Sequence, residues 1–348
     1  MGPNHIRQQP VLAKNGVRRD AKAEYKAGRS AITLPNFEAK LQPFQRTDKL
    51  REACTQLVRR DTCEQILWHY TSADAAIEIV KSSCLHLACH SFMSDPAEGL
   101  RSPALVTASW QAAIDRVGKH PKLDLKYLRD TDIVLAGFGD YKPHNPPTFL
   151  VSFSVLRDSL SQWARYGADG AGIALGFRVE PAHFKRFTPA QERSYGPFLY
   201  KIFYDLDGDQ RADKVAVSPA VDTAQLRNRL TDLFDSFLRS ADAPTEIENA
   251  LYLIAHDLKP VIKQSAYYEE QEWRIAAGTV IESTSLYDLR ATRFGIAPFM
   301  VLPFCSGVQL EEIRFGPKLS RDNQWTCEWL CRKHGLSVNV SQSAFAYR

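Results

Sequence analysis

The chain has 348 residues, of which 44% are hydrophobic and 24% are charged, which is an ordinary soluble composition with enough apolar residues for a sizeable core. It contains no run of about eighteen apolar residues, and its first thirty residues lack the apolar segment of a secretory signal. The seven cysteines are odd in number and lack tandem metal spacing, which favours free thiols in a reducing compartment. We therefore expect a cytoplasmic globular protein without a membrane span.

Positive charge is concentrated near the N-terminus. Residues 1–60 contain 13 Lys and Arg against 5 Asp and Glu, a net charge of +8, whereas the remainder of the chain has a net charge of −4. Because this segment lacks a sustained apolar period, we expect residues 1–60 to be a flexible basic arm, dispensable for folding, and residues 61–348 to be one α+β domain. The arm could bind nucleic acid or an anionic membrane, or act as a delivery signal into a host cell.

From residue 61 onward the sequence alternates between strand and helix patterns. In chain order we predict strand 65–70, helix 73–82, strand 85–89, helix 102–117, strand 149–155, helix 158–166, strand 172–177, helices 222–240 and 245–258, strands 269–276, 298–303 and 311–315, helix 320–333 and strand 336–340. Thr71 or Ser72 is expected to cap the first helix. This mixed order, without an internal repeat, is typical of the α+β class.

Two predicted strands each place polar side chains on one face. Because side chains at positions i and i+2 of a strand share a face, Ser152 and Ser154 point the same way. By the same rule Glu270, Glu272 and Arg274 share a face of a later strand. Neighbouring carboxylates raise each other's pKa when they are buried together. They therefore indicate either an exposed edge strand that Arg274 neutralises or a cleft that uses the two acids.

Trp163 and Tyr166 lie three positions apart on a predicted helix that ends before Gly167, so they share a helix face. They could be core residues that close the helix onto the sheet. They could equally form an aromatic wall for a flat heterocycle such as nicotinamide, because cationic and amide-bearing rings stack well on aromatic faces. The sequence leaves both interpretations open.

The remaining chemical candidate is a group of soft metal ligands, Cys84, His86, Cys89 and His90. Their spacing is irregular, and alternation along a short strand would send them to opposite faces. We therefore expect no metal site. The sequence also lacks a glycine-rich phosphate loop, a dinucleotide-binding fingerprint, a serine nucleophile elbow and a His-Glu-x-x-His motif.

Several of these segments together resemble a bacterial protein family, domain of unknown function twenty-nine seventy-one, which occurs among phage-defence and toxin-like genes. The resemblance spans roughly residues 65–348 and leaves the basic arm outside. The matching segments are Trp68–Ser72, Ser94–Glu98, Val151–Ser154, Trp163–Gly167, Gly172–Phe177, Lys263 with Glu270–Arg274, and Ile313–Pro317. The family usually has Asn where this chain has Ser94.

That family is in turn similar to the ADP-ribosyltransferases, which implies a mixed or antiparallel split β-sheet with flanking helices. In those enzymes a His or Arg on the first strand holds the nicotinamide-side ribose, a Ser-x-Ser or Tyr element supports the cofactor, and a Glu on a later strand is catalytic. The resemblance thus implies that His69 holds the ribose, and that Glu272 is catalytic with Glu270 assisting. Ser152 and Ser154 would support NAD.

The same resemblance adds further contacts to NAD. It implies that Tyr70, Arg274 and the aromatic pair Trp163 and Tyr166 take part in binding the cofactor. Cleavage of the nicotinamide–ribose bond passes through an oxocarbenium-like state, which a carboxylate near the anomeric carbon stabilises. Glu272 would supply that carboxylate.

These features lead to one main hypothesis and two rivals. The main hypothesis is transfer of ADP-ribose from NAD to a protein or nucleic acid, or NAD hydrolysis without an acceptor, by a toxin, effector or phage-defence protein that a cognate antitoxin or a secretion machinery would accompany. The first rival is a non-catalytic module of a defence or immunity system that binds a nucleotide or a partner protein. The second rival is a nuclease or nucleic-acid binder, suggested by the basic arm and by Asp95 and Glu98, although no metal-ligand pattern supports it.

Overall fold

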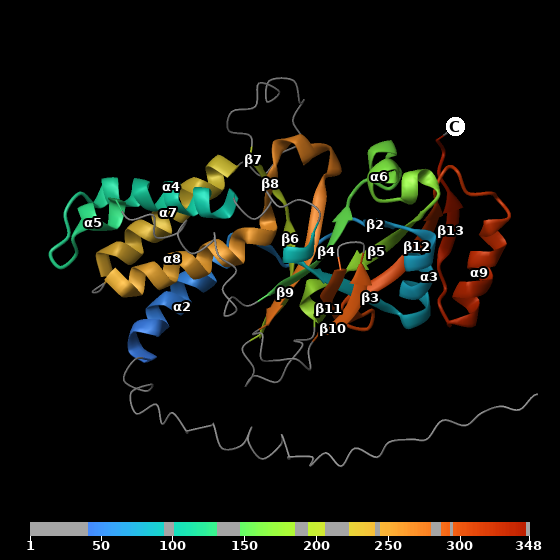
Figure 1. Cartoon of the computed structure of the whole chain (residues 1–348), viewed down its shortest axis with the longest axis horizontal. Helices are drawn as coiled ribbons and strands as arrows, with labels where there is room; N and C mark the ends of the chain where they lie inside the picture. The colour runs from blue at the N-terminus through green and yellow to red at the C-terminus, as the bar shows by residue number, and fades with distance from the viewer. Residues whose placement is uncertain are drawn as a thin grey trace, which may run out of the picture. The chain divides into compact units, whose positions relative to one another are not determined.

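The computed structural model describes residues 41–93, 101–130, 147–184, 194–205, 223–240, 244–279, 287–292 and 295–345 of the chain (Figure 1). The chain divides into two units, Met1–Pro43 and Phe44–Arg348. The second unit belongs to the α+β class, because it contains a mixed, open β-sheet with flanking helices. This is the fold class that the alternating pattern of the sequence predicts.

One large sheet organises the second unit. Its described strands lie in the order β1-β6-β9-β4-β2-β5-β12-β13, and β3, β11 and β10 branch from β4. Their bounds are β1 Arg59–Arg60, β2 Leu67–Thr71, β3 Cys84–Cys89, β4 Thr148–Ser154, β5 Ile173–Val179, β6 Ser194–Lys201, β9 Glu272–Thr279, β10 Asp288–Thr292, β11 Gly295–Pro303, β12 Val308–Phe315 and β13 Asn339–Gln342. A separate parallel pair joins β7 (Phe203–Asp205) to β8 (Ile262–Gln264).

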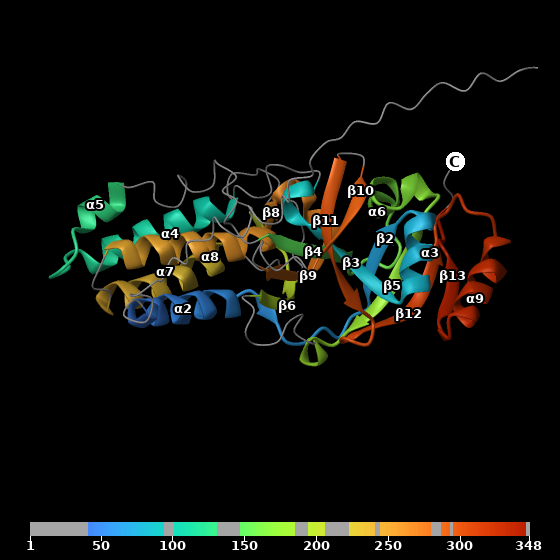
Figure 2. The same cartoon turned by 60° about the horizontal axis from the view of Figure 1, so that its bottom comes forward.

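The helices gather around two apolar cores. The α-helices are α2 Leu41–Gln56, α3 Ala73–Ser82, α4 Arg101–Val117, α5 Leu125–Asp130, α6 Leu160–Arg165, α7 Thr223–Ser240, α8 Pro244–Leu258 and α9 Asn323–Lys333. Figure 2 shows α4 lying beside α7 and α8, and α2 joins them in one helical core. The buried faces of α3 and α9 pack instead on the core of the sheet. None of the described helices is both long enough and apolar enough to cross a membrane.

The first predicted strand and helix form where the sequence places them. Ser72 caps α3, because its Oγ accepts the backbone N–H of Ala75 at 3.3 Å. Ala76, Ile79 and Val80 recur at helical spacing and are buried against the sheet. This local pattern anchors the end of β2, the strand that carries His69.

The sheet forks at β4, and the fork positions the candidate site. One edge of β4 pairs along its whole length with β9. The other edge pairs with β3 at its beginning, through Phe149 and Leu150, and with β2 at its end, through the single pair Trp68 and Ser154. The branches then diverge, since β3 continues to β11 and β2 to β5. Ser152 lies between them and pairs with neither branch.

The strand predicted at 269–276 is corrected by the structure. Residues Ser265–Glu270 form a 3₁₀ helix, and β9 begins only at Glu272. Between them Gln271 has a left-handed φ of 43°, a conformation that a β-strand does not contain. Glu270 therefore reaches Glu272 from a helical turn, and not as a neighbour on one strand face.

The folded part of the chain also begins earlier than the boundary expected at residue 61. Leu50, Cys54 and Val58 are buried in the helical core, and β1 pairs with β6. Arg51 forms an ion pair with the buried Asp257. The apolar pattern of the sequence does not predict this packing, because the segment contains few apolar residues and charged residues separate them. Residues 1–40 of the expected arm and the loop at 94–98 lie outside the described residues.

The earlier boundary predicts that Leu50→Ala destabilises the full-length protein. Loss of this buried side chain, which is 6% exposed, should lower the free energy of unfolding by about 2–5 kcal/mol. Its neighbour Lys49 is exposed, so Lys49→Ala should change the same quantity by less than about 0.5 kcal/mol. Urea unfolding measures both variants. Equal stabilities would show that this segment does not pack on the core.

Candidate functional site

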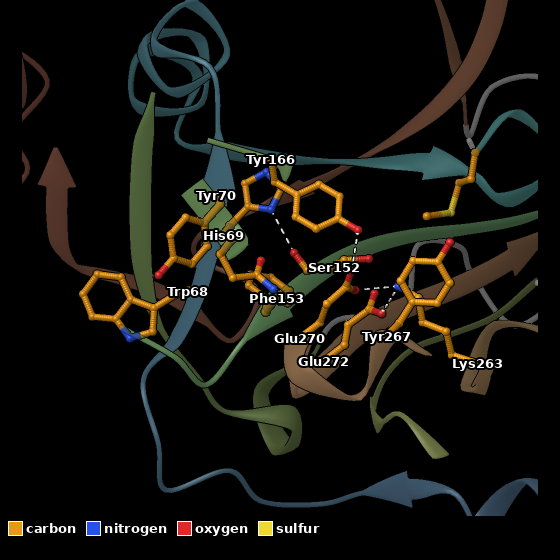
Figure 3. A pocket seen from close by; sticks show the side chains of 12 residues that line it. Trp68, His69, Tyr70, Ser152, Phe153, Tyr166, Lys263, Tyr267, Glu270 and Glu272 are labelled. Atoms are coloured by element: carbon orange, nitrogen blue, oxygen red, sulfur yellow. Dashed lines mark hydrogen bonds and ion pairs between the residues drawn. The ribbon is translucent and has the colours of Figure 1, made fainter. Parts of the chain in front are cut away.

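A cavity of about 230 Å³ opens where β2 and β4 diverge (Figure 3). Its walls come from segments that are far apart in the sequence: β2, β4, α6, β8, the turn Ser265–Glu270 and the start of β9. The lining residues are Trp68, His69, Tyr70, Met93, Ser152, Phe153, Gln162, Tyr166, Lys263, Tyr267, Glu270 and Glu272. His69, Ser152 and the two carboxylates, which are far apart in the sequence, therefore meet around one space.

Lys263 on β8 holds the two carboxylates of the cavity together. Its Nζ lies 2.7 Å from Oε2 of Glu270 and 2.8 Å from Oε2 of Glu272, and Figure 3 shows both acids directed at this amine. All three side chains are buried. Burial opposes the charge on Lys263, but Glu272 and Glu270 outweigh it and raise its pKa. The ammonium thus cancels the repulsion that two adjacent buried carboxylates would otherwise feel.

Arg274 is the second cation that holds Glu272, and it contacts both carboxylate oxygens. Its Nε donates to Oε1 of Glu272 at 2.7 Å and its Nη2 donates to Oε2 at 3.1 Å. Its Nη1 donates to the carbonyl of Pro260 at 2.8 Å, and the side chain is completely buried. Burial alone would raise the pKa of Glu272, but the charges and hydrogen bonds of Arg274 and Lys263 lower it to about 2. Glu272 therefore stays ionised at physiological pH.

Glu270 is tied to α6 and to β4. Its Oε1 accepts hydrogen bonds from Oη of Tyr166 at 2.9 Å and from Nη1 of Arg165 at 3.0 Å. Its backbone carbonyl accepts Oγ of Ser154 at 2.6 Å. Burial raises the pKa of Tyr166; Glu270 adds to this effect and Lys263 opposes it. The phenol consequently remains protonated and can donate to Glu270.

His69 occupies the gap that the fork leaves in the sheet. Its Nδ1 lies 2.9 Å from the carbonyl oxygen of Ser152, which is in the part of β4 that pairs with neither branch. The ring also meets Phe153 edge-on, with the centroids 6.0 Å apart. Burial lowers the pKa of His69; the charge of Arg290 adds to this, and the hydrogen bond to Ser152 opposes it. The imidazole is therefore neutral at physiological pH.

The aromatic wall expected from Trp163 and Tyr166 is only half present. Tyr166 lines the cavity and is 43% exposed. Trp163 is fully buried; its Nε1 donates to Oδ1 of Asp158 at 2.7 Å, and its ring meets Tyr70 edge-on at 4.8 Å. Trp163 is thus a core residue that supports Tyr70, and cannot stack on a ligand ring.

The other expected contact residues divide in the same way. Tyr70 and Ser152 line the cavity, although the hydroxyl of Tyr70 is bonded to the carbonyl of Leu156 at 2.7 Å. Ser154 and Arg274 are buried and are not lining residues. They hold the backbone of Glu270 and the carboxylate of Glu272, so their role is to position the acids.

Residue patterns in the sequence did not predict three residues of the site. Lys263 was indicated only by the family resemblance. A lysine directly after the apolar residues Val261 and Ile262 is nevertheless a signal of a buried, paired cation. Tyr204 binds the start of β9, because its Oη accepts the N–H of Glu272 at 2.9 Å. Tyr267 lines the cavity and packs its ring 4.7 Å from Nζ of Lys263.

The structure separates the soft metal ligands that lie close together in the sequence. Within the described ranges, no group of three or more His, Cys, Asp or Glu residues could hold a metal ion. The alternation of β3 partly exposes Cys84 and His86 on one face and buries Cys89 on the other. This separation is the one that the strand pattern predicts.

Comparison with known proteins finds one similarity, which covers part of this site. Residues 162–275 match the family model described as protein of unknown function (DUF2971). The matched range contains Tyr166, Lys263 and both carboxylates, but it is less than half of the chain and excludes His69. No curated protein and no solved structure matches the chain. The chain is therefore similar to this family over the segment that supplies the acidic side of the cavity.

Lys263→Met should destabilise the protein strongly. The substitution keeps most of the side-chain volume but leaves Glu270 and Glu272 buried without their shared cation, and breaking a buried pair in this way costs about 3–5 kcal/mol. Because Glu272 has a lowered pKa, its ion pairs contribute stability above its unfolded pKa of about 4.3, and that contribution is lost as pH falls toward 2. The difference between wild type and variant should be largest near neutral pH and shrink in acid.

A matched control is Lys259→Met. Lys259 is half-buried and has no acidic partner at ion-pair distance in the described chain, so its replacement should cost less than about 1 kcal/mol and show little pH dependence. Denaturant unfolding across the acid range measures both variants. Equal, pH-independent losses would refute a special role for Lys263.

Proposed function

We propose that this chain cleaves the nicotinamide–ribose bond of NAD in the cavity and transfers ADP-ribose to a protein or nucleic acid, or to water when no acceptor is present. The observation that carries the proposal is the convergence of His69 from β2 with Glu270 and Glu272, which flank the junction of the 3₁₀ helix and β9, on one cavity. In a toxin, effector or defence protein, such a reaction would modify a macromolecule of the target cell.

The chemistry of bond cleavage suits a fixed carboxylate. As the bond from ribose to nicotinamide lengthens, positive charge develops on the ribose, and a preorganised anion stabilises it. Glu272 is held ionised and immobile by Lys263 and Arg274. With a pKa of about 2 it is a poor proton donor or acceptor near pH 7. Its role in the proposed reaction is therefore electrostatic.

The size of the cavity suits one end of the cofactor. At about 230 Å³ it falls below the roughly 300–1,000 Å³ typical of pockets for drug-sized ligands. It would therefore enclose the nicotinamide and its ribose, and the adenosine end of NAD would lie outside. Tyr166 and Tyr267 offer aromatic faces for the nicotinamide ring, while Ser152 and Tyr70 complete the wall.

One observation favours a second candidate, a module that binds a nucleotide without cleaving it. Three cationic side chains, Arg165, Lys263 and Arg274, contact the two carboxylates. Because these cations already engage both carboxylates, less of the negative charge of the acids is left to stabilise a developing cation on the ribose. Such a module would bind NAD and leave it intact.

Release of free nicotinamide from NAD, measured with and without host lysate as a source of acceptor, tests the proposal. Glu272→Gln keeps the shape of the side chain but removes its charge, so NAD should still bind while turnover falls by about two orders of magnitude or more. Binding of NAD by the wild type without release of nicotinamide in either condition would select the binding module instead.

Glu270→Gln should reduce transfer to an acceptor more than hydrolysis, because the first Glu of the resembling enzymes prepares the acceptor. Glu311→Gln is the matched control, since Glu311 lies on β12 and pairs with Arg178 away from the lining residues. Thermal unfolding of each variant separates loss of chemistry from loss of fold. Wild-type turnover in the folded Glu272→Gln protein would contradict the assigned role.

A further inference from the structure

The proposed reaction needs a group that takes the proton of the attacking water or hydroxyl, and the carboxylates are poorly placed for that task. Glu272 has a pKa of about 2 and so has little affinity for a proton near pH 7. The oxygens of Glu270 already accept hydrogen bonds from Lys263 and Tyr166. Both of those partners have raised pKa values and stay protonated. A different lining residue must accept the proton.

His69 is the imidazole of the described cavity lining, and its tautomer is set by the fold. A carbonyl oxygen can only accept a hydrogen bond, so Nδ1 must carry the hydrogen in its 2.9 Å contact with Ser152. In the neutral ring Nε2 is then an unprotonated acceptor. No other described residue bonds to Nε2, so the lone pair is available.

The groups around His69 keep the ring neutral. Burial is the largest influence that lowers its pKa, and Arg290 on β10 adds to it. The other titratable groups that line the same cavity are the acids with Lys263, and the phenols Tyr70, Tyr166 and Tyr267. The acids and Lys263 form ion pairs with one another, so their opposite charges largely cancel in their effect on the pKa of His69.

We infer that Nε2 of His69 is the general base of the reaction, an inference that rests on the proposed function. In the step, the O–H bond of water or of an acceptor hydroxyl breaks and its proton passes to Nε2. The oxygen forms a bond to C1′ of the ribose as the bond from C1′ to the nicotinamide nitrogen breaks, and the electron pair leaves with nicotinamide as a neutral molecule. The imidazolium then returns its proton to solvent.

The expected signature is a rise of kcat with pH, an acid limb of the pH profile, that is caused by the ionisation of His69. Since only the neutral ring accepts a proton, kcat for nicotinamide release should rise as pH passes through the pKa of His69 and level off above it. That pKa is lowered, so the limb should lie below about pH 6.5. Steady-state kinetics over pH, at saturating NAD, measure it.

His69→Gln should lower kcat by about 10²–10⁴-fold, abolish the pH limb and leave KM for NAD within a few-fold. His69→Gly should regain part of its turnover when imidazole is added, with a pH dependence that follows the ionisation of the added imidazole. His86→Gln is the matched control, because His86 is also a half-buried histidine with a lowered pKa but does not line the cavity. It should retain both turnover and limb.

The outcomes distinguish a failure of the proposed NAD cleavage from a failure of the role of His69 as base. If wild-type protein releases no nicotinamide in any condition, the proposed function fails and this role fails with it. If wild type is active but His69→Gln retains the limb and most of kcat, or raises KM alone without imidazole rescue, only the role as base is overturned. Nitrogen-detected NMR of the His69 ring gives a readout besides activity: hydrogen on Nε2 in the neutral ring would contradict the inferred tautomer.

Discussion

The buried ammonium of Lys263 is the interaction on which the site depends. It joins β8 to the helical turn that carries Glu270 and to the strand that carries Glu272. Burying these charges offers little net stability over an apolar alternative, yet removing one partner is costly because the remaining charges stay buried and lose part of their compensation. The ion pairs therefore act mainly as a constraint on geometry: the two acids can occupy this region only in the arrangement that Lys263 and Arg274 impose.

The fork in the sheet positions His69, because it leaves a backbone carbonyl that needs a hydrogen-bond donor. A backbone carbonyl that is shielded from water must find a donor, and the divergence of β2 and β3 leaves Ser152 without a strand partner on that edge. The side chain of His69 fills this place. The cavity thus forms where the backbone hydrogen bonds between the strands stop. The hydrogen bond from His69 to the carbonyl of Ser152 replaces one of them and also orients the imidazole.

Because of these two constraints, the acids and the imidazole have different protonation states near neutral pH. Cations hold Glu272 ionised, whereas burial and Arg290 hold His69 neutral. Titratable groups whose environments separate their pKa values are the usual basis for dividing chemical roles within one site. Here the carboxylate supplies fixed charge and the imidazole supplies a free lone pair, while Tyr166 stays protonated as a hydrogen-bond donor.

The sequence by itself determined the local elements, because helix and strand periods are short-range properties: β2 with α3 and its Ser72 cap, and the shared face of Ser152 and Ser154, follow from spacing alone. Only the tertiary structure decided the rest. Whether Trp163 was wall or core, and whether α2 packed, depended on neighbours distant in sequence. Likewise, the left-handed turn at Gln271 and the ion pairs of Lys263 arise from contacts between β4, β8 and β9, which no local pattern encodes.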